Sequence, residues 1–497
     1  MLELTNHVLV DVGIHTITAF AGVESPSQVT PQHLDAIADQ LAQIYSSGIG
    51  RNLAQGIVFP NSGFTQAAFD GPKFAHKRRA WADLVLRGHQ HLDLEPIVRA
   101  LDKPEYRAMV LRDVADAPPC AFTGKPAYLR VSRDMFPMLN GRGVINFGGL
   151  GMAGVPVSDL ALLAIHAMPL GCVISQGRLL AVESDDPTLA FGIARRNYEK
   201  NIAFLSLAAQ GTMIGFPNIS SFKTRLIDLL VDVIDTRSDG DYEYRIPSLT
   251  AYHFSNSGQD AKMDIYSLPS PVVAFVREAN RGSRRTAWQA IVGRAWQEEK
   301  SEQEELQEEK PKITRRNFLY EDLFSLPQNA RAFLRTYILR QPLKALKNDV
   351  RGTYDLRRES DLVSWEITDL FLRRMMNMEK ARIDKIRELG DSLAEYIRQH
   401  DDRRLLKVLY NATRYQAFRL ALLRTIAQQR GGGAEPLVPF DTYIKVFEES
   451  EDFERTDWNL ARDLLLIRIF EQLHHTHKLA ELADALEPES TTDSDAE

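Results

Sequence analysis

The sequence predicts an α+β fold in which a mixed α/β N-terminal part is followed by a C-terminal helical bundle. Helical periodicity dominates residues 1–110, and short apolar runs separated by glycine turns follow at 120–185. From about residue 286 the spacing of apolar residues is helical almost to the end. We therefore expect an α/β domain at 1–285, a helical connector at 286–359, a bundle at 360–484 and a disordered acidic tail at 485–497.

The N-terminal part contains a helix whose limits are marked in the sequence. Thr30 is a typical N-cap, Pro31 fits the first helical position, and Gly48 fits the end. One apolar face is formed by Leu34, Ile37, Leu41 and Ile44. The run "IVFPNSGFTQAAF" follows as a short strand that leads into a turn.

The middle of the chain combines strands with one apolar helix near 158–167, for which Ser158 is the expected N-cap. The preceding "GGLGMAG" has G-x-G-x-x-G spacing, but "VPVSD" separates it from the helix, so it does not fit a dinucleotide site. The stretches "YRIPSLTAYHF" and "KMDIYSLPSPVVAFV" are predicted strands on either side of the loop "SNSGQD". A hairpin is therefore expected here.

The C-terminal bundle contains the long apolar stretch "DDRRLLKVLYNATRYQAFRLALLRTIAQQ", which we interpret as one largely buried helix. On a continuous helix one polar stripe is formed by Arg403, Lys407, Tyr410 and Arg414. Cations with one aromatic side chain can follow a nucleic-acid backbone. A solvated helix face is the alternative.

The charge distribution is uneven although the formal net charge is only −7. Residues 298–310 carry seven acids and two lysines, whereas residues 373–430 carry fourteen Lys/Arg and seven Asp/Glu. The basic blocks could contact a polyanion. The two cysteines, the absence of a signal-peptide pattern and the lack of a long apolar run predict a soluble cytoplasmic protein with no membrane association. No catalytic motif, metal site or cofactor site is recognised, which does not exclude an enzyme but leaves no catalytic residue to name.

Four stretches in order resemble the large subunit of a type I-B CRISPR Cascade complex: "FPNSGF", "CAFTGKPA" with "GVPVSDLALLAIHAMPLG", "YHFSNSGQDAKMDIYSLP", and the basic helical C-terminus. Members of that family carry Cys-x-x-Cys-Gly and a second cysteine pair in a Gly-x-Pro-x-Cys-x-x-Cys context. Here Thr123 follows Cys120 in place of the second cysteine, and the second pair is missing from Val157–Ala161. The resemblance therefore implies a degenerate zinc-knuckle-like region without metal.

The resemblance also implies a non-enzymatic function and a set of partners. Such a subunit works with crRNA and with the backbone, handle-binding and small subunits, and it recognises the protospacer-adjacent motif on target double-stranded DNA. It helps to start the R-loop, holds the displaced strand, and recruits a helicase–nuclease or a transposition adaptor. An internal start at Met375, Met376 or Met378 could give a separate small subunit, although methionines also fill irregular cores.

In that context several residues are candidates for DNA contact. Asn256, Ser257 and Gln259 could read base edges, and Asn61 and Ser62 lie on a second expected turn, although these are ordinary turn residues too. Candidates for phosphate contact, or else for plain surface charge, are Lys223, Arg225, Arg281, Arg284 and Arg285. The displaced strand would follow the stripe of the bundle. A metal-dependent nuclease and a helical protein-binding scaffold are the alternatives.

Overall fold

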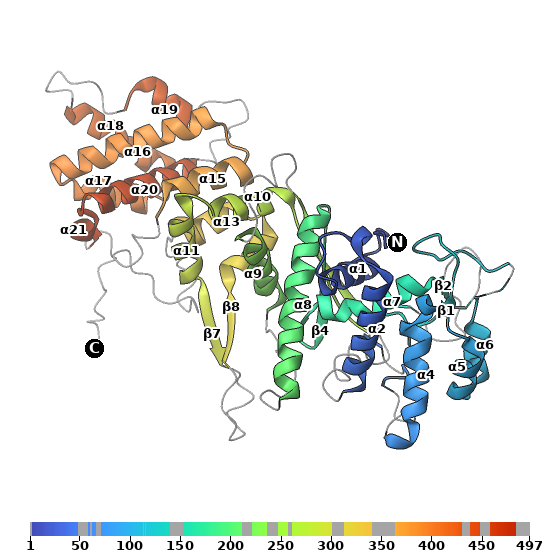
Figure 1. Cartoon of the computed structure of the whole chain (residues 1–497). Coiled ribbons are helices and arrows are strands. Elements are labelled where there is room, and N and C mark those ends of the chain that lie inside the picture. The colour runs from blue at the N-terminus through green and yellow to red at the C-terminus, as the bar shows by residue number, and fades with distance from the viewer. Residues whose placement is uncertain are drawn as a thin grey trace, which may run out of the picture. The chain divides into compact units, whose positions relative to one another are not determined.

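The computed structural model describes residues 2–47, 58–59, 62–65, 71–112, 114, 116–139, 153–210, 221–235, 247–256, 261–300, 313–339, 363–429, 438–447 and 458–483. The chain forms two compact units, residues 1–270 with 300–314 and residues 271–299 with 315–497. The division falls at Ser270, whereas the sequence placed the end of the N-terminal domain at residue 285. The predicted α+β class is confirmed, with small antiparallel sheets and a helical C-terminal region (Figure 1).

The first unit contains most of the mixed structure. Its helices are α1 (Val8–Phe20), α2 (Pro31–Ser46), α4 (Ala75–Leu86), α5 (Leu94–Leu101), α6 (Pro104–Met109), α7 (Asp159–Ala167), α8 (Pro187–Ala209) and α9 (Phe222–Asp235). Both predicted N-caps are confirmed: the Thr30 side chain accepts from the N–H of His33, and that of Ser158 from the N–H of Ala161.

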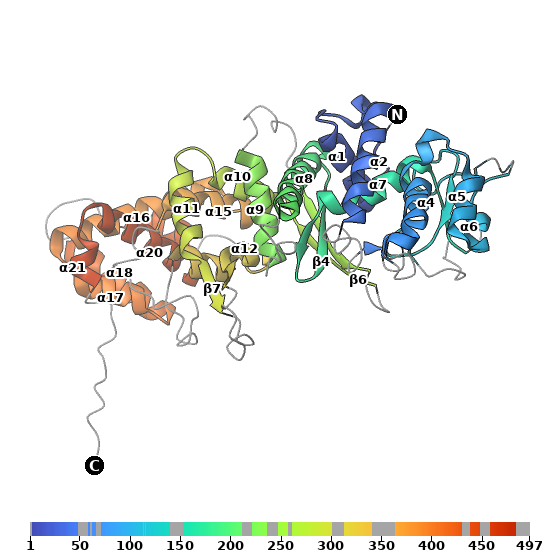
Figure 2. The ribbon, with the colours of Figure 1, turned by 60° about the horizontal axis from the view of Figure 1, so that its bottom comes forward.

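Two antiparallel sheets accompany these helices. β1 (Leu129–Val131) pairs with β2 (Val155–Val157), and a four-stranded sheet has the order β3 (Val173–Ser175), β4 (Arg178–Ser184), β5 (Leu249–Ser255), β6 (Lys262–Leu268). The predicted hairpin is confirmed, because β5 and β6 pair from Leu249 opposite Leu268 to Ser255 opposite Lys262. Both α1 and α8 contact β4 and pack against each other, and Figure 2 shows them beside the sheet.

The strand predicted for "PVVAFV" is wrong, because this segment lies in a helix, α10 (Ser270–Ala279). Val272, Val273 and Val276 are buried at spacings that suit one helix face. Ser270 and Pro271 stand at the start, and Pro is tolerated in the first turn since its missing N–H has no partner there in any helix. The β-branched residues alone had suggested a strand.

Helix α1 lies in the centre of the first core. Every residue from Leu9 to Thr18 is buried, as expected for a helix that is apolar on nearly all sides. The hydroxyls of Thr16 and Thr18 donate to the carbonyls of Val12 (2.7 Å) and Ile14 (2.8 Å), so their burial leaves no unpaired hydroxyl donor. This helix positions both cavities described below.

The second unit is mainly helical. It contains α10, α11 (Arg284–Arg294), α12 (Phe318–Asp322), α13 (Ala330–Phe333), α15 (Trp365–Met375), α16 (Lys380–His400), α17 (Arg403–Asn411), α18 (Tyr415–Gln429), α19 (Phe440–Phe447), α20 (Trp458–His475) and α21 (Leu479–Ala483). A turn of π-helix, Leu334–Leu339, follows α13. Helix α16 packs along α20, with α19 against both. Met375 is buried at the end of α15, while Met376 and Met378 are half-buried.

The segment predicted as a helical connector also contains a two-stranded sheet, formed by β7 (Trp296–Lys300) and β8 (Ile313–Asn317). The acidic residues between these strands and the acidic tail at 485–497 lie outside the described residues. The sequence of β7, "WQEEK", carries little apolar signal, so the pattern of apolar residues did not predict a strand here.

One long helix was predicted at 401–429, and this prediction is wrong. The segment forms two helices, α17 and α18, with a break between Asn411 and Tyr415. The chain leaves helical geometry at Ala412, where φ is −60° and ψ is 117°. The buried guanidinium of Arg462, on α20, donates to the carbonyl of Ala412 and is paired with Asp463. This tertiary contact takes the place of a helical hydrogen bond. The break between the two helices is therefore stabilised by Arg462, which is 50 residues away in the sequence.

Candidate functional site

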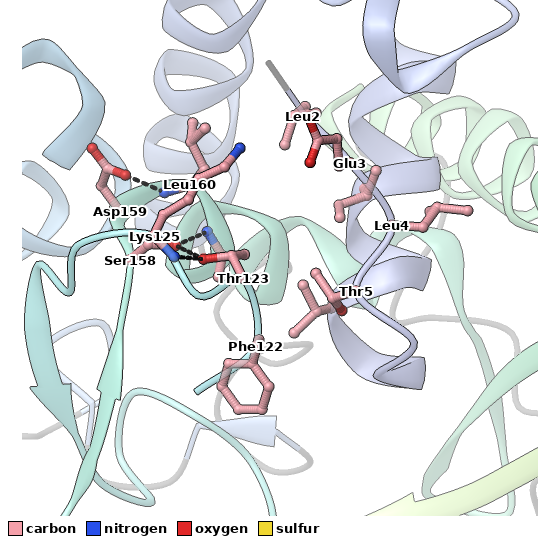
Figure 3. A pocket seen from close by; sticks show the side chains of 13 residues that line it. Leu2, Glu3, Leu4, Thr5, Phe122, Thr123, Lys125, Ser158, Asp159 and Leu160 are labelled. Atoms are coloured by element: carbon pink, nitrogen blue, oxygen red, sulfur yellow. Dashed lines mark hydrogen bonds between the residues drawn. The ribbon is translucent and has the colours of Figure 1, made fainter. Parts of the chain in front are cut away.

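Cys120 lies in a hydrogen-bonded cluster at the start of α7. The side chain is buried, and its Sγ accepts a hydrogen bond from the N–H of Phe122 (3.4 Å). The hydroxyl of Thr123 donates to Oγ of Ser158 (3.3 Å) and accepts from the N–H of Lys125 (3.3 Å). Figure 3 shows Thr123, Lys125 and Ser158 meeting at this point. Two separated parts of the sequence, the turn at 120–125 and the start of α7, therefore meet at one thiol.

The local backbone explains this convergence. The turn at 120–125 is closed by hydrogen bonds from the N–H of Cys120 to the carbonyl of Lys125 (2.7 Å) and from the N–H of Gly124 to that of Cys120 (3.0 Å). Gly124 has φ of 67°, which glycine adopts readily and a side chain would disfavour. The N–H of Ala121 donates to the carbonyl of Pro156 (2.9 Å), which connects the turn to β2 and so to α7.

The environment of Cys120 lowers the pKa of its thiol. Burial would raise that pKa, but the nearby hydroxyls of Thr123 and Ser158 and the N–H of Phe122 favour the thiolate and outweigh burial. The other cysteine, Cys172, differs: complete burial raises its pKa. Among the described residues, no three His, Cys, Asp or Glu side chains are placed to hold a metal ion together. Cys120 is thus polarised by hydrogen-bond donors.

A cavity of about 140 Å³ adjoins this cluster. The extended N-terminal residues, among them Leu2 and Thr5, form one side, and Phe122, Thr123 and Lys125 form the other (Figure 3). Its lining mixes apolar side chains with one lysine and two acids. The cavity is too small for a typical drug-sized ligand, which occupies about 300 Å³ or more.

Asn256, predicted to read a base edge, is completely buried. Its Nδ2 donates to the carbonyls of Val58 (2.8 Å) and Arg133 (3.3 Å), and its Oδ1 accepts from Nε of Arg133 (3.2 Å) and the N–H of Met138 (3.3 Å). The structure contradicts the prediction, because every donor and acceptor group of this amide already has a partner. Asn256 instead fixes the end of β5 to the rest of the first unit.

Ser62 is also buried rather than exposed on a turn, and its hydroxyl donates to Oγ1 of Thr65 (3.2 Å). That prediction is corrected, since a fully buried hydroxyl cannot contact DNA. Asn61, Ser257 and Gln259 lie outside the described residues.

The cations predicted to contact phosphates already interact with other groups of the protein. Nζ of Lys223 lies 5.7 Å from the ring centre of Tyr266, and Arg225 is paired with Asp228 (3.6 Å). In the second unit, Arg284 donates to the carbonyl of Glu278 (3.2 Å). Arg285 is exposed and Arg281 half-buried, both with further interactions of their own.

The predicted cationic stripe is divided by the break after α17. Arg403, Lys407 and Tyr410 lie on α17, whereas Arg414 lies in the turn before α18. Arg403 is paired with Asp401 (3.3 Å), and the half-buried ring of Tyr410 lies 6.0 Å from that of Phe470. Lys407 and Arg414 are exposed.

Three further exposed cations lie in the same region as Lys407 and Arg414, and the sequence had not singled them out. Within the part of the chain that the structure describes, five exposed cations of this region make no ion pair or hydrogen bond through their side chains. These α17–α18 cations are Arg404, Lys407, Arg414, Arg419 and Arg424. The i, i+3 spacing of Arg404 and Lys407 and the lack of acids between 403 and 430 were the signal that could have identified them.

No family model, no curated protein and no solved structure matches this chain. None of the helices described has both the length and the hydropathy that crossing a membrane requires.

Proposed function

We propose that this chain is the non-catalytic large subunit of a type I-B-like Cascade complex, and that its α17–α18 cations hold the displaced DNA strand. The observation that carries the proposal is the set of five exposed cations without acidic partners among the described residues. Elsewhere in the same unit several exposed cations are paired, as in Arg373 with Asp369 (2.6 Å) and Arg374 with Glu278 (2.5 Å). Unpaired cations are available to replace the counterions of a phosphate backbone.

The Cys120 cluster supports the more specific, family-level part of the proposal. The four positions that the resemblance assigns to zinc ligands are Cys120, Thr123, Ser158 and Ala161. Thr123 and Ser158 are hydrogen-bonded to each other, and the N–H of Ala161 donates to Oγ of Ser158 (3.4 Å). Positions 38 residues apart in the sequence therefore meet around one thiol. Such an arrangement suits a knuckle in which hydrogen bonds have replaced the metal.

The proposal divides DNA recognition between guide RNA and protein. Base pairing with crRNA supplies sequence specificity, so the protein needs phosphate contacts and a short reader of the adjacent motif. For that reader, Ser257 and Gln259 stay as candidates, and Asn256 anchors the end of β5 that precedes them in the sequence. The subunit would then recruit the helicase–nuclease or the transposition adaptor once the R-loop has formed.

The experiment compares the salt dependence of single-strand binding by two variants. In the first, Arg404→Gln, Lys407→Gln and Arg414→Gln remove three of the unpaired α17–α18 cations. Full-length protein, alone and assembled with guide RNA and partners, is titrated with labelled single-stranded DNA between about 50 and 200 mM salt. If all three contact phosphates, the slope of log K against log salt falls in magnitude by about 2.

The matched control removes three cations of the same unit that are already paired. Arg373→Gln, Lys385→Gln and Arg398→Gln remove the same charge, but their partners are Asp369, Glu388 and Glu395. This control leaves the slope unchanged. Equal slopes for wild type and the first variant would contradict strand binding at α17–α18. Cleavage of DNA by the purified chain with Mg²⁺ would favour a nuclease, and normal complex assembly without any DNA binding would favour a protein-binding scaffold.

A further inference from the structure

A second, larger cavity lies between α1, β4 and α8 in the first unit. Its volume is about 380 Å³, within the range of about 300–1,000 Å³ that is typical of small-molecule sites. Its wall is formed by the N-terminal segment, one face of α1, the end of β4, the start of α8 and the start of β5. The resemblance discussed above assigns no role to this cavity.

The lining of the cavity is acidic. Asp11, Glu183 and Asp185 all contribute to it, together with the polar residues Ser248 and Thr250. No lysine or arginine is found among the lining residues that the structure describes. With three carboxylates and no base, the cavity favours a positively charged occupant.

Each carboxylate is held in place by protein donors. Asp11 accepts from the N–H groups of Thr5 (2.7 Å) and Asn6 (2.9 Å) and from the hydroxyl of Thr5 (2.8 Å). Glu183 accepts from the hydroxyl of Tyr252 through Oε2 (3.1 Å), and Asp185 from the N–H of Ser248 (2.7 Å).

Oε1 of Glu183 receives no hydrogen bond from the described residues. A carboxylate accepts more than one hydrogen bond, so Glu183 can accept another through this oxygen.

His15 provides an independent indication of a ligand. This side chain lines the cavity, it is 4% exposed, and no described residue forms a hydrogen bond with its imidazole. Burial lowers its pKa to about 4, so the imidazole is neutral near pH 7 and offers one acceptor nitrogen. A buried imidazole without a partner is costly, and a ligand in the cavity that donates a hydrogen bond to this ring would remove that cost.

The arrangement of the acids selects among cations. Within the described residues no three acidic or imidazole groups are close enough to hold one metal ion, so the negative charges of this cavity are distributed along its wall. A compact ion can neutralise only one of them at a time. A flexible molecule with two or more separated ammonium groups can reach several, and its methylene chain can contact apolar lining residues such as Val8, Val12 and Val182.

We propose that the cavity lined by Asp11, His15, Glu183 and Asp185 binds a linear diamine or polyamine. The ammonium groups donate to Glu183, Asp185 and the floor of the cavity at Asp11 and His15. The ligand would also connect α1 to β4 and α8, and therefore stabilise the first unit. This inference stands apart from the Cascade proposal, and neither depends on the other.

The test is calorimetric titration of the full-length protein at near-physiological salt with 1,4-diaminobutane, with spermidine and with the uncharged analogue 1,4-butanediol. Both amines are expected to bind and to raise the melting temperature, whereas the diol does neither. The double variant Glu183→Gln/Asp185→Asn keeps side-chain size and should weaken amine binding about tenfold or more. Circular dichroism of the ligand-free variant establishes that it is folded.

A control variant removes two acids that lie outside the cavity, Asp116→Asn with Glu379→Gln, both at exposed positions. It should bind the amines like wild type. Failure of both amines to bind wild type, equal binding by the double variant, equal binding of the diol, or displacement of the amines by equimolar Mg²⁺ would each overturn the proposal. Weakening by the control variant as well would identify the binding as unspecific attraction to an acidic protein.

Discussion

At the residue scale, the cluster around Cys120 is the part of the molecule in which the proposed degenerate knuckle can be tested. Thr123 and Ser158 fill two of the positions where the resemblance places ligands, and their hydroxyls take part in the network around the thiol. A hydrogen-bonded cluster of this kind needs no metal to satisfy its polar atoms. Cysteines introduced at the three other positions test whether these four positions can bind one metal ion.

The variant Thr123→Cys/Ser158→Cys/Ala161→Cys should bind one Zn²⁺ per chain. Four thiolates that converge at one point form a tetrahedral site with Zn–S distances of about 2.3 Å. Metal analysis after dialysis and X-ray absorption at the zinc edge measure the stoichiometry and the ligand shell. Chelation of the metal should lower the melting temperature of the variant, because binding free energy adds to folding free energy.

The matched control is Thr123→Cys alone, which supplies two thiols and should retain far less zinc. If the triple variant folds, as circular dichroism can establish, but retains no more zinc than this control, the four positions do not form the geometry of a knuckle.

Asn256 shows that the sequence can predict a turn without revealing which of its side chains are buried. The turn chemistry of "SNSGQD" correctly predicted a hairpin between β5 and β6, since Asn, Ser and Gly favour turns. The sequence could not show that this amide is buried, because its partners Val58 and Arg133 are 198 and 123 residues away. Local patterns identify the turn, and distant contacts decide which of its side chains reach solvent.

At the element scale, α1 and α7 approach so closely that only glycine fits between them. A Cβ at Gly13 would overlap the carbonyl oxygen of Ala164 on α7. The same two helices carry Asp11 and His15 of the acidic cavity and Ser158 and Ala161 of the Cys120 cluster. Their packing therefore positions both sites.

Gly13→Ala should destabilise the first unit by about 1–3 kcal/mol or more, because the added methyl group meets backbone rather than a flexible side chain. Gly293→Ala in α11 is the control: a Cβ there meets nothing within 4 Å, and alanine favours helix over glycine, so stability should be unchanged or slightly higher. Denaturant unfolding, followed separately for each unit, measures both effects. A Gly13→Ala protein as stable as wild type would show that the two helices can separate without cost.

The break between α17 and α18 could not be predicted from the local sequence. The apolar pattern of this region is helical on both sides of the break, so periodicity alone predicted one helix. The contact between Arg462 and the carbonyl of Ala412 comes from another helix and overrides local propensity. By contrast, Thr30 and Ser158 were predicted correctly as N-caps, because a cap depends on neighbouring residues only.

At the scale of the whole molecule, a formal net charge of −7 conceals separate charged regions with opposite roles in our account. The first unit contains an acidic cavity suited to amines, and the second contains cations suited to a phosphate backbone. Composition could predict a local basic surface but could not decide which cations are paired, since pairing depends on the fold. A protein whose specificity comes from guide RNA needs few base-reading residues of its own.

We propose that this chain works as a subunit of a guide-RNA complex, and affinity purification from its own cells is the sharpest test of that proposal. The tagged full-length chain is isolated at moderate salt, the bound RNA is sequenced, and the co-purifying proteins are quantified. We predict short RNAs that share one constant 5′ handle and carry variable guides, together with several copies of a backbone subunit for each copy of this chain. Recovery of the chain without such RNA, or with RNA of no common handle, would contradict the account.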